Sequence, residues 1–268
     1  MSTLPEPHTF SAAALAAKSL SFSYVKSTII HDVSVQFPAG KISVIIGPNG
    51  CGKSTLLHLL AGLYRPSSGE VSLQGQPLSS FTPKSRAKQL SLLPQTNVSP
   101  EGMTVKGLIS RGRYAWQTLF SQWHEDDEKA VNDALLQTGL SDLADREIAT
   151  LSGGQRQRAW IGLVLAQQTP LILLDEPTTF LDIGHQIDVL NVCEKRNRED
   201  GTTIVMVLHD INLAARYAHH IVAMKDGEIV ASGAPASVCT SGNMQLLFGI
   251  DALVMEDPVH YSPLILPR

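Results

Sequence analysis

Short apolar runs, separated by glycine and proline, divide this chain into predicted strands and helices. Two β-prone runs, Lys18 to Tyr24 and Thr28 to Phe37, come first, and Pro-Ala-Gly follows them. These runs predict an antiparallel layer. The apolar run Ile42 to Ile46 precedes a glycine-rich loop and a helical pattern over residues 53–63. This order predicts a buried strand, a loop and a helix.

Two later aliphatic runs, Leu171 to Leu174 and Thr202 to Leu208, are each followed by polar residues. Such runs are typical of strands buried on both faces, and the carboxyl ends of parallel strands are where α/β sheets bind ligands. Between residues 96 and 168 helical periodicity replaces the β signals, notably over 124–138 and 155–168. We therefore expect an α/β protein with a mixed, mostly parallel sheet, an N-terminal antiparallel β layer and an inserted helical lobe at about 96–168.

The two ends of the chain contain weaker signals. We expect residues 1–16 to form a flexible leader, because they lack the pattern of a signal peptide. Residues 221–232 contain Lys-Asp-Gly-Glu between apolar arms, which predicts a β-hairpin. Residues 235–267 contain one short helical pattern and a proline-rich end, too little for another domain. The predicted main domain is thus 17–240, and a C-terminal extension follows at 241–268.

Composition narrows the class of protein. Hydrophobic residues make up 43% of the chain, which supports a substantial core, and the formal net charge is -4. This charge offers no general attraction for nucleic acid, so we expect no nucleic-acid partner. Three cysteines, Cys51, Cys193 and Cys239, have no zinc-type spacing and fit a reducing cytosol. No apolar run reaches the roughly 20 residues of a spanning helix, so action at a membrane would require other subunits.

A phosphate-binding loop is the strongest chemical signal. The loop comprises Gly47, Pro48, Asn49, Gly50, Cys51, Gly52, Lys53, Ser54 and Thr55. It matches G-x-x-x-x-G-K-[ST] between a predicted strand and a predicted helix, which is the context of a P-loop NTPase core. Its backbone N–H groups would surround the β-phosphate of ATP, and Lys53 would pair with the β- and γ-phosphates. Ser54 would ligate Mg²⁺, and Thr55 would face the α-phosphate.

Asp175 and Glu176 place two carboxylates at the end of a buried strand. A buried charge requires a cation or a hydrogen-bond partner, and Mg²⁺ is the natural partner of Asp175. Glu176 would orient or deprotonate the attacking water, a role worth about 10²–10⁴-fold in rate. The alternative is an acidic surface turn before Pro177.

Three single residues complete the candidate site. His209 follows the third aliphatic strand, and its alternative role is that of a hydrogen-bonded core histidine. Gln95 would contact Mg²⁺ and water through its amide; otherwise it is a polar loop residue. Tyr24 is the candidate for stacking on adenine, and packing within the β layer is its alternative.

A second glycine-rich segment opens a predicted helix at Leu151, Ser152, Gly153, Gly154 and Gln155. Backbone N–H groups and the peptide dipoles at a helix start favour an anion. One ATP needs only one cradle for its inner phosphates, so a second cradle indicates a nucleotide held from two sides by two copies of the chain. The alternative is ordinary helix N-cap chemistry.

From Lys18 to Gly233 the chain resembles the ATP-binding cassette (ABC) ATPases. The order of motifs matches that family: aromatic loop, Walker A, Q-loop at Gln95, signature from Leu151, Walker B, D-loop around Asp182 and switch His209. The resemblance implies a head-to-tail homodimer around two ATP. It also implies that Ser152 and Gly154 contact the γ-phosphate held by the other subunit, that Asp182 crosses the interface, and that His209 senses the γ-phosphate.

A narrower resemblance is to the ATPase subunits of ferric siderophore importers, with haem and cobalamin importers as near relatives. It is carried by residues 92–95, 101–105, 111–113 and 175–186, including the tail of the D-loop through His185 and Gln186. It implies two integral membrane permease subunits, an extracytoplasmic substrate-binding protein that acts indirectly, and a peripheral position on the cytoplasmic face of the inner membrane. The competing class is a soluble ABC ATPase for metal-cluster assembly or DNA repair. A P-loop kinase would need neither signature nor D-loop.

Two further expectations concern single side chains. Cys51 stands near a helix N-terminus, where thiolate character is expected to increase. Residues 111–123 interleave arginines and aromatics. In the family this region forms a groove that receives a short helix of the membrane subunit, so Arg111 and Arg113 are the candidate contacts. The alternative is packing within the helical lobe.

Overall fold

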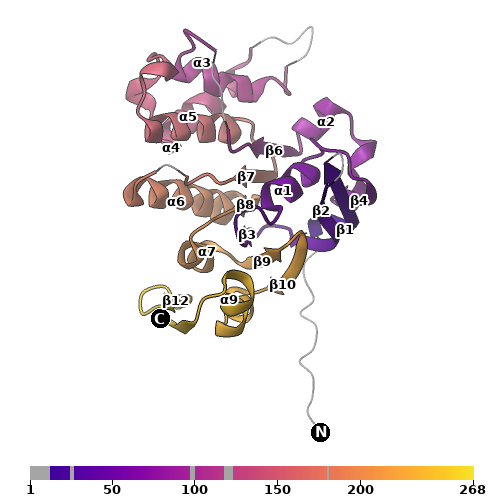
Figure 1. The fold of residues 1–268 in the computed structure, drawn as a ribbon. Helices are drawn as coiled ribbons and strands as arrows, with labels where there is room; N and C mark the ends of the chain where they lie inside the picture. Colours follow the sequence, from indigo (N-terminus) through magenta and orange to yellow (C-terminus); the bar gives the residue numbers. More distant parts are fainter. Residues whose placement is uncertain (1–12, 25–26, 97–99, 118–122, 180) are drawn as a thin grey trace.

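The computed structural model describes residues 13–24, 27–96, 100–117, 123–179 and 181–268 (Figure 1). A six-stranded sheet lies at its centre, in the order β10-β9-β3-β8-β7-β6. All neighbours pair in parallel except β10 with β9. The strands are β3 (Ile42–Ile46), β6 (Leu90–Leu93), β7 (Leu171–Asp175), β8 (Thr203–Val207), β9 (His220–Lys225) and β10 (Glu228–Gly233). The predicted mixed, mostly parallel sheet is confirmed.

A second, antiparallel sheet has the order β2-β1-β4-β5. Its strands are β1 (Ala13–Tyr24), β2 (Ser27–Pro38), β4 (Ser68–Leu73) and β5 (Gln76–Pro77). The N-terminal antiparallel layer is thus confirmed. The strand begins at Ala13, however, so residues 13–16 belong to β1 and not to a leader. Ala14 and Leu15 are buried in this layer, so the predicted boundary of the leader at residue 16 lies too far along the chain. Residues 1–12 lie outside the described residues.

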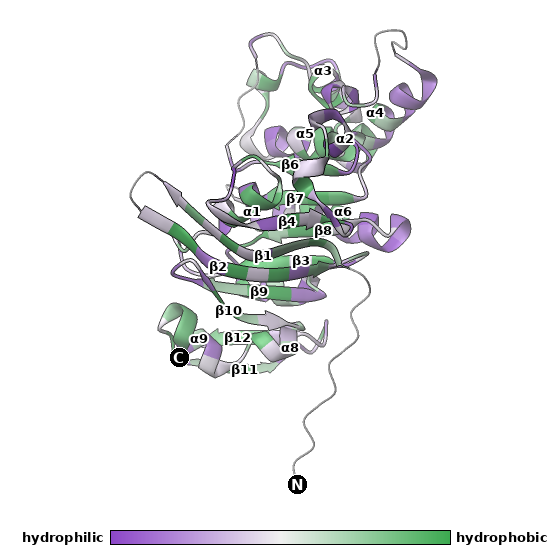
Figure 2. Cartoon of the chain, turned by 90° about the vertical axis from the view of Figure 1, so that its right-hand side faces the viewer, coloured by the Kyte–Doolittle hydropathy of each residue, from purple (hydrophilic) through white to green (hydrophobic). Residues whose placement is uncertain are grey.

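Each central strand has side chains on two faces, and a different group of elements covers each face. In β3, Val44 and Ile46 belong to one hydrophobic cluster and Ile45 belongs to the other, as a period of two requires. The antiparallel sheet and α1 (Lys53–Leu60) cover the Ile45 face. Residues of α6 (Ile183–Asp200), α7 (Ile211–Tyr217) and the helical lobe pack in the other cluster. Figure 2 shows the buried central strands as strongly hydrophobic.

The helical lobe lies between β6 and β7 in the sequence and beside the β6 edge in space (Figure 1). Its helices are α3 (Val105–Ser110), η2 (Arg111–Arg113), α4 (Glu125–Gln137), η3 (Ser141–Leu143), η4 (Ile148–Thr150) and α5 (Gly153–Ala166). The two predicted helical patterns correspond to α4 and α5. A short connection outside the lobe carries η1 (Leu78–Ser80) and α2 (Pro83–Ala87).

The C-terminal part is more ordered than the sequence predicted. The β9–β10 hairpin is confirmed, and its turn residues Asp226 and Gly227 both have positive φ angles, of 48° and 80°. Two helices follow, α8 (Pro235–Val238) and α9 (Ser241–Phe248), and then a two-stranded sheet of β11 (Ala252–Glu256) and β12 (Pro263–Pro267). We expected a single helix and a proline-rich end. Prolines at both ends of β12 weakened the strand signal without preventing its pairing.

Asn212, in the first turn of α7, attaches this terminal hairpin to the core. Its side-chain amide donates to the Ile265 carbonyl at 3.2 Å and accepts from the Ile265 N–H at 2.8 Å. The amide therefore pairs with β12 as a neighbouring peptide group would.

Among the described residues, no helix combines the length and the apolar character needed to cross a bilayer.

Candidate active site

The phosphate loop connects β3 to α1, at the carboxyl edge of the sheet. Gly47 and Gly52 have φ angles of 151° and 101°, which L side chains rarely adopt. A Cβ atom at Gly47 would lie 2.1 Å from the Met224 carbonyl oxygen, so a larger residue does not fit. Gly52 is the N-cap of α1, which begins at Lys53. The loop therefore leads directly into the N-terminus of α1.

Lys53 is buried inside this loop. Its ammonium donates to the carbonyl oxygens of Gly47 at 2.9 Å and Pro48 at 2.8 Å, and only 5% of the residue is exposed. A buried ammonium held by loop carbonyls is a fixed positive charge at the place where the predicted phosphates would bind. Lys53 thus lies within the phosphate loop, and its contact with the phosphates stays a prediction.

Asp175, the last residue of β7, faces the start of α1. Its Oδ1 accepts a hydrogen bond from Ser54 Oγ at 2.8 Å. Its Oδ2 is buried without a hydrogen-bond partner among the described residues. Burial raises the pKa of Asp175, although the Ser54 hydrogen bond acts in the opposite direction. The adjacent oxygens of Asp175 Oδ1 and the Ser54 hydroxyl form a donor set that suits a hard divalent cation such as Mg²⁺.

Glu176 is held in place by three side chains. Its Oε2 accepts from Gln95 Nε2 at 2.8 Å and from Thr179 Oγ1 at 3.1 Å, and its Oε1 lies 2.7 Å from His209 Nε2. Burial alone would raise its pKa, but hydrogen bonds from His209, Gln95 and Thr179 outweigh burial and lower the pKa. The side chain is therefore an ionised acceptor at neutral pH.

The backbone of Glu176 is strained as well. Its φ of 52° is unusual for a residue other than glycine, and such a conformation costs on the order of 1–3 kcal/mol. The three partners come from the loop after β6, from the turn after β7 and from the loop after β8. Backbone strain that surrounding contacts maintain is typical of functional positions. Here the strained backbone accompanies a carboxylate that contacts His209 and Gln95.

A cavity of about 510 Å³ brings most of the predicted residues together. It is lined by Tyr24, Ile29, Asn49, Gly50, Gly52, Lys53, Ser54, Thr55, Gln95, Glu176 and His209. Tyr24 is 45% exposed at its rim, and its ring contacts those of Phe22 and Tyr64 edge-on, with centroids 4.8 and 5.8 Å away. Tyr24 is thus both packed within the β layer and open to the cavity.

The signature segment and Asp182 lie outside this cavity. Ser152 caps α5: its Oγ accepts from the Gln155 N–H at 3.2 Å, and the Gln155 side chain accepts from the Ser152 N–H at 3.0 Å. Gly153 is exposed, and a Cβ atom there would meet nothing within 4 Å. Asp182 caps α6, and its side chain is 70% exposed. The ends of α5 and α6 are neighbours, since a Cβ at Gly154 would lie 3.5 Å from Leu181.

Two predictions about single residues are wrong. Arg113 is not available for a membrane subunit, because it is buried and its Nε lies 2.7 Å from Asp127 Oδ1. Cys51 is 3% exposed, and burial raises the pKa of its thiol instead of increasing its thiolate character. Arg111 is exposed and stays a prediction. Phe180 of the D-loop and residues 118–122 lie outside the described residues.

Sequence reasoning did not find His58, Tyr64 or Thr179. Thr179 stands three residues after Glu176, and His58 stands four residues after Ser54 on α1. Helical spacing could have indicated His58, because residues four apart share a face. Tyr64 carried no local signal, since its contact with Tyr24 is made between distant segments.

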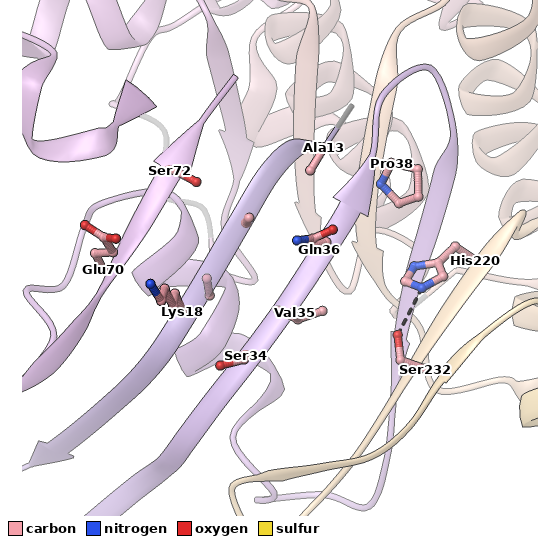
Figure 3. A pocket seen from close by; sticks show the side chains of 12 residues that line it. Ala13, Lys18, Ser34, Val35, Gln36, Pro38, Glu70, Ser72, His220 and Ser232 are labelled. Atoms are coloured by element: carbon pink, nitrogen blue, oxygen red, sulfur yellow. Dashed lines mark hydrogen bonds between the residues drawn. The ribbon is translucent and has the colours of Figure 1, made fainter. Parts of the chain in front are cut away.

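A second cavity, of about 500 Å³, lies between the antiparallel sheet and the β9–β10 hairpin (Figure 3). Ser232 Oγ lies 3.0 Å from His220 Nε2 in its wall. Burial lowers the pKa of His220, so this histidine is neutral at pH 7. Lys18 and Glu70 occupy paired positions of β1 and β4 on the opposite wall. None of the residues predicted to bind nucleotide lines this cavity.

The chain matches known proteins along nearly its full length. Residues 30–179 match the family model described as ABC transporter. The ferric enterobactin transport ATP-binding protein FepC of Escherichia coli (strain K12) is 47% identical, over 97% of this chain and 96% of that protein. The achromobactin transport ATP-binding protein CbrD of Dickeya dadantii (strain 3937) is 48% identical, over 95% and 94%. The hemin import ATP-binding protein HmuV of Thermobifida fusca (strain YX) is 37% identical, over 99% and 92%.

Solved structures share the fold. An ABC transporter described as of metal-chelate type, in an inward-facing conformation, matches with a TM-score of 0.82 and 28% identity, over 96% of this chain and 98% of that one. A dimeric, post-hydrolysis state of the ATP-binding cassette MJ0796, bound to ADP and phosphate, matches with a TM-score of 0.74 and 28% identity, over 82% and 98%.

Proposed function

The chain belongs to the ABC transporter family and is an ATPase, and from this premise we propose that it energises the import of a ferric siderophore. The observation that carries the catalytic part is the Glu176 carboxylate, ionised and held by Gln95, Thr179 and His209 beside the phosphate loop. A positioned carboxylate that stays ionised can accept a proton from an attacking water.

ATP would bind with its adenine on Tyr24 and its phosphates in the loop of residues 47–55. Lys53 supplies a fixed positive charge there, so the loop binds and orients the phosphate chain. Ser54 and Asp175 would hold Mg²⁺, which supplies charge neutralisation on the transferred phosphoryl group. Gln95 Nε2 is committed to Glu176, which leaves its amide oxygen for the cation.

A second copy of the chain would complete each site. Ser152, Gly153, Gly154 and Gln155 are absent from the cavity of their own chain, and so is Asp182. The exposed helix start at Ser152 offers N–H groups to an anion. ATP closes such a homodimer only through its greater affinity for the closed state. A γ-phosphate held by one chain and contacted by the signature segment of the other supplies that difference.

The proposed partners in transport are two integral membrane permease subunits, with an extracytoplasmic binding protein acting indirectly and no nucleic acid. The chain would work peripherally on the cytoplasmic face of the membrane. The relatives that transport ferric enterobactin and achromobactin are 47% and 48% identical, whereas the hemin import relative is 37% identical. This difference favours a siderophore over haem as cargo, with haem and cobalamin as alternatives.

Replacement of the carboxylate tests the catalytic proposal. We expect Glu176→Gln to bind ATP, to lose about 100-fold or more of its hydrolysis rate, and to accumulate as an ATP-dependent dimer in size-exclusion chromatography. Glu228→Gln, the same change at an exposed position, should behave as the unmodified chain. A chain that stays monomeric with ATP while hydrolysis continues would refute the shared site.

Uptake assays test the cargo. Cells that carry Lys53→Ala should lose uptake of labelled ferric siderophore while uptake of haem and cobalamin continues. Loss of haem or cobalamin uptake alone would reassign the cargo. Purification without any membrane protein, together with unchanged uptake of all three, would favour a soluble ABC ATPase instead.

A further inference from the structure

Two side chains of α1 face the same carboxylate. Ser54 and His58 are four residues apart on this helix, a spacing that places both on one face. Ser54 Oγ donates to Asp175 Oδ1 at 2.8 Å, and His58 Nε2 lies 3.5 Å from Asp175 Oδ2. The helix therefore approaches both oxygens of the carboxylate, one with each side chain.

The His58 contact joins two buried atoms that have no other polar partner. Within the described part of the chain, neither His58 Nε2 nor Asp175 Oδ2 makes a hydrogen bond, and neither atom is exposed. The Asp175 side chain has no exposed surface, and that of His58 is 18% exposed. A small adjustment would bring this buried donor and this buried acceptor into a hydrogen bond, because leaving either group unpaired costs free energy.

Aromatic rings fix the position of the imidazole. The Tyr64 ring meets the His58 ring edge-on, with centroids 5.2 Å apart and planes at 90°. Tyr64 in turn is stacked on Phe22, at 5.4 Å and 7°, and contacts Tyr24 at 5.8 Å. His58 thus lies between the Tyr64 ring on one side and the Asp175 carboxylate on the other.

We propose that His58 is a positioning residue for Asp175: its Nε2–H donates to Oδ2, so that the carboxylate presents Oδ1, beside Ser54, to the divalent cation. The inference rests on the proposed function, because it assumes that Ser54 and Asp175 hold Mg²⁺. Carboxylates that ligate metals are themselves hydrogen-bonded by neighbouring groups, and loss of such a partner typically weakens metal affinity by about 10–100-fold.

The competing explanation is that His58 only packs against Tyr64. The two explanations differ in the property that a substitution changes. A packing residue alters the stability of the chain and the affinity for ATP, with or without Mg²⁺. A positioning residue alters the Mg²⁺-dependent part of binding and leaves Mg²⁺-free binding unchanged.

The test measures ATP binding by calorimetry in the Glu176→Gln background, with EDTA and across a Mg²⁺ titration. His58→Leu should keep its Mg²⁺-free affinity for ATP within about twofold and require about tenfold more Mg²⁺ to tighten binding. His58→Gln, whose amide Nε2 can donate from a similar position, should recover most of the loss. His260→Leu, at an exposed histidine of the C-terminal hairpin, is the matched control.

The outcomes separate the inference from its premise. An unchanged Mg²⁺ requirement in His58→Leu, while the parent shows Mg²⁺-dependent tightening, overturns the role of His58 alone. An equal loss of affinity with and without Mg²⁺, accompanied by a lower melting temperature and no rescue by His58→Gln, assigns His58 to packing and also overturns it. If Mg²⁺ does not tighten ATP binding in the parent, both the proposed cation site and this inference fail.

Discussion

The buried ion pair of the helical lobe yields a prediction whose magnitude follows from its contacts. Arg113 Nε lies 2.7 Å from Asp127 Oδ1, and its Nη1 donates to the Ala166 carbonyl at 2.9 Å and to Gln168 Oε1 at 3.0 Å. Both charged side chains are 6% exposed. Arg113→Met keeps much of the volume but leaves Asp127 as an uncompensated buried charge. We expect a loss of about 3–5 kcal/mol in the free energy of unfolding.

A double substitution distinguishes a lost pair from lost packing. When both charges are replaced by apolar residues, a buried pair often becomes nearly neutral in stability. Asp127 also accepts from the His124 N–H at 3.1 Å and so caps α4, and loss of a cap costs about 1 kcal/mol. Arg113→Met with Asp127→Leu should therefore be more stable than Arg113→Met alone, by roughly 2 kcal/mol.

The pH dependence of the ion pair has a defined sign. Burial would raise the pKa of Asp127, but hydrogen bonds from Arg113 and the His124 N–H lower it below the ordinary value. A carboxyl with a depressed folded-state pKa contributes stability above its unfolded pKa, about 3.9, and loses it as the pH falls through the folded value. The difference in stability between the unmodified chain and Arg113→Met should therefore shrink below about pH 4.

Tryptophan fluorescence during urea unfolding is a suitable assay, because the chain has 3 tryptophans and all of them, Trp116, Trp123 and Trp160, belong to the helical lobe. The unfolding midpoint should be compared rather than the amplitude, since Arg113 lies over the Trp116 ring. Arg111→Met, in the same turn but exposed, is the control. A loss below about 1 kcal/mol for Arg113→Met, or a double variant less stable than the single one, would refute the reasoning.

Three further predictions concern buried thiols, the terminal hairpin and the signature glycine. All three cysteines are buried, and burial raises the pKa of Cys193 to about 12 and of Cys239 to about 11. Iodoacetamide should therefore modify none of them, Cys51 included, until urea unfolds the chain. Rapid labelling of Cys51 in the folded chain, detected by mass spectrometry, would contradict this. Asn212→Leu should accelerate hydrogen exchange at residues 252–267 while β7 and β8 stay protected, because it removes both bonds to Ile265; unchanged exchange would show that packing alone attaches the hairpin. Gly153→Ala should leave the melting temperature unchanged, since its Cβ meets nothing within 4 Å, yet reduce the ATP-dependent dimer of Glu176→Gln; Gly112→Ala, whose Cβ would lie 2.3 Å from the Leu163 carbonyl, should instead destabilise the lobe.

The parts of the site that the sequence predicted are those that depend on local structure. The loop from Gly47 to Thr55 needs only a strand before it and a helix after it, and the structure supplies both. Asp175 ends β7, Glu176 follows it, and His209 comes after the adjacent parallel strand β8, so these residues meet at one edge of the sheet. The hairpin turn was likewise predictable from local sequence alone, because the pair Asp226-Gly227 favours such a turn.

The predictions that were wrong depended on distant contacts. Arg113 looked like a surface arginine because its partners, Asp127 and the Ala166 carbonyl, lie 14 and 53 residues away. The helix start near Cys51 suggested an activated thiol, but tertiary packing buries that thiol, and desolvation outweighs the nearby Lys53 charge. The terminal hairpin is bonded to Asn212, 53 residues before Ile265, and no local pattern indicated that pairing.

The capping box at Ser152 has a consequence for a protein that would close and open its dimer many times. Its two reciprocal hydrogen bonds fix the start of α5 within a single chain, so the ordering entropy of this segment is lost once, during folding. Binding surfaces ordered in advance associate without a further loss of conformational freedom. The Ser152 hydroxyl accepts from Gln155 and keeps its proton available as a donor. In the proposed dimer, each round of closing and opening would therefore reuse a rigid contact, with no loop to refold between one turnover and the next.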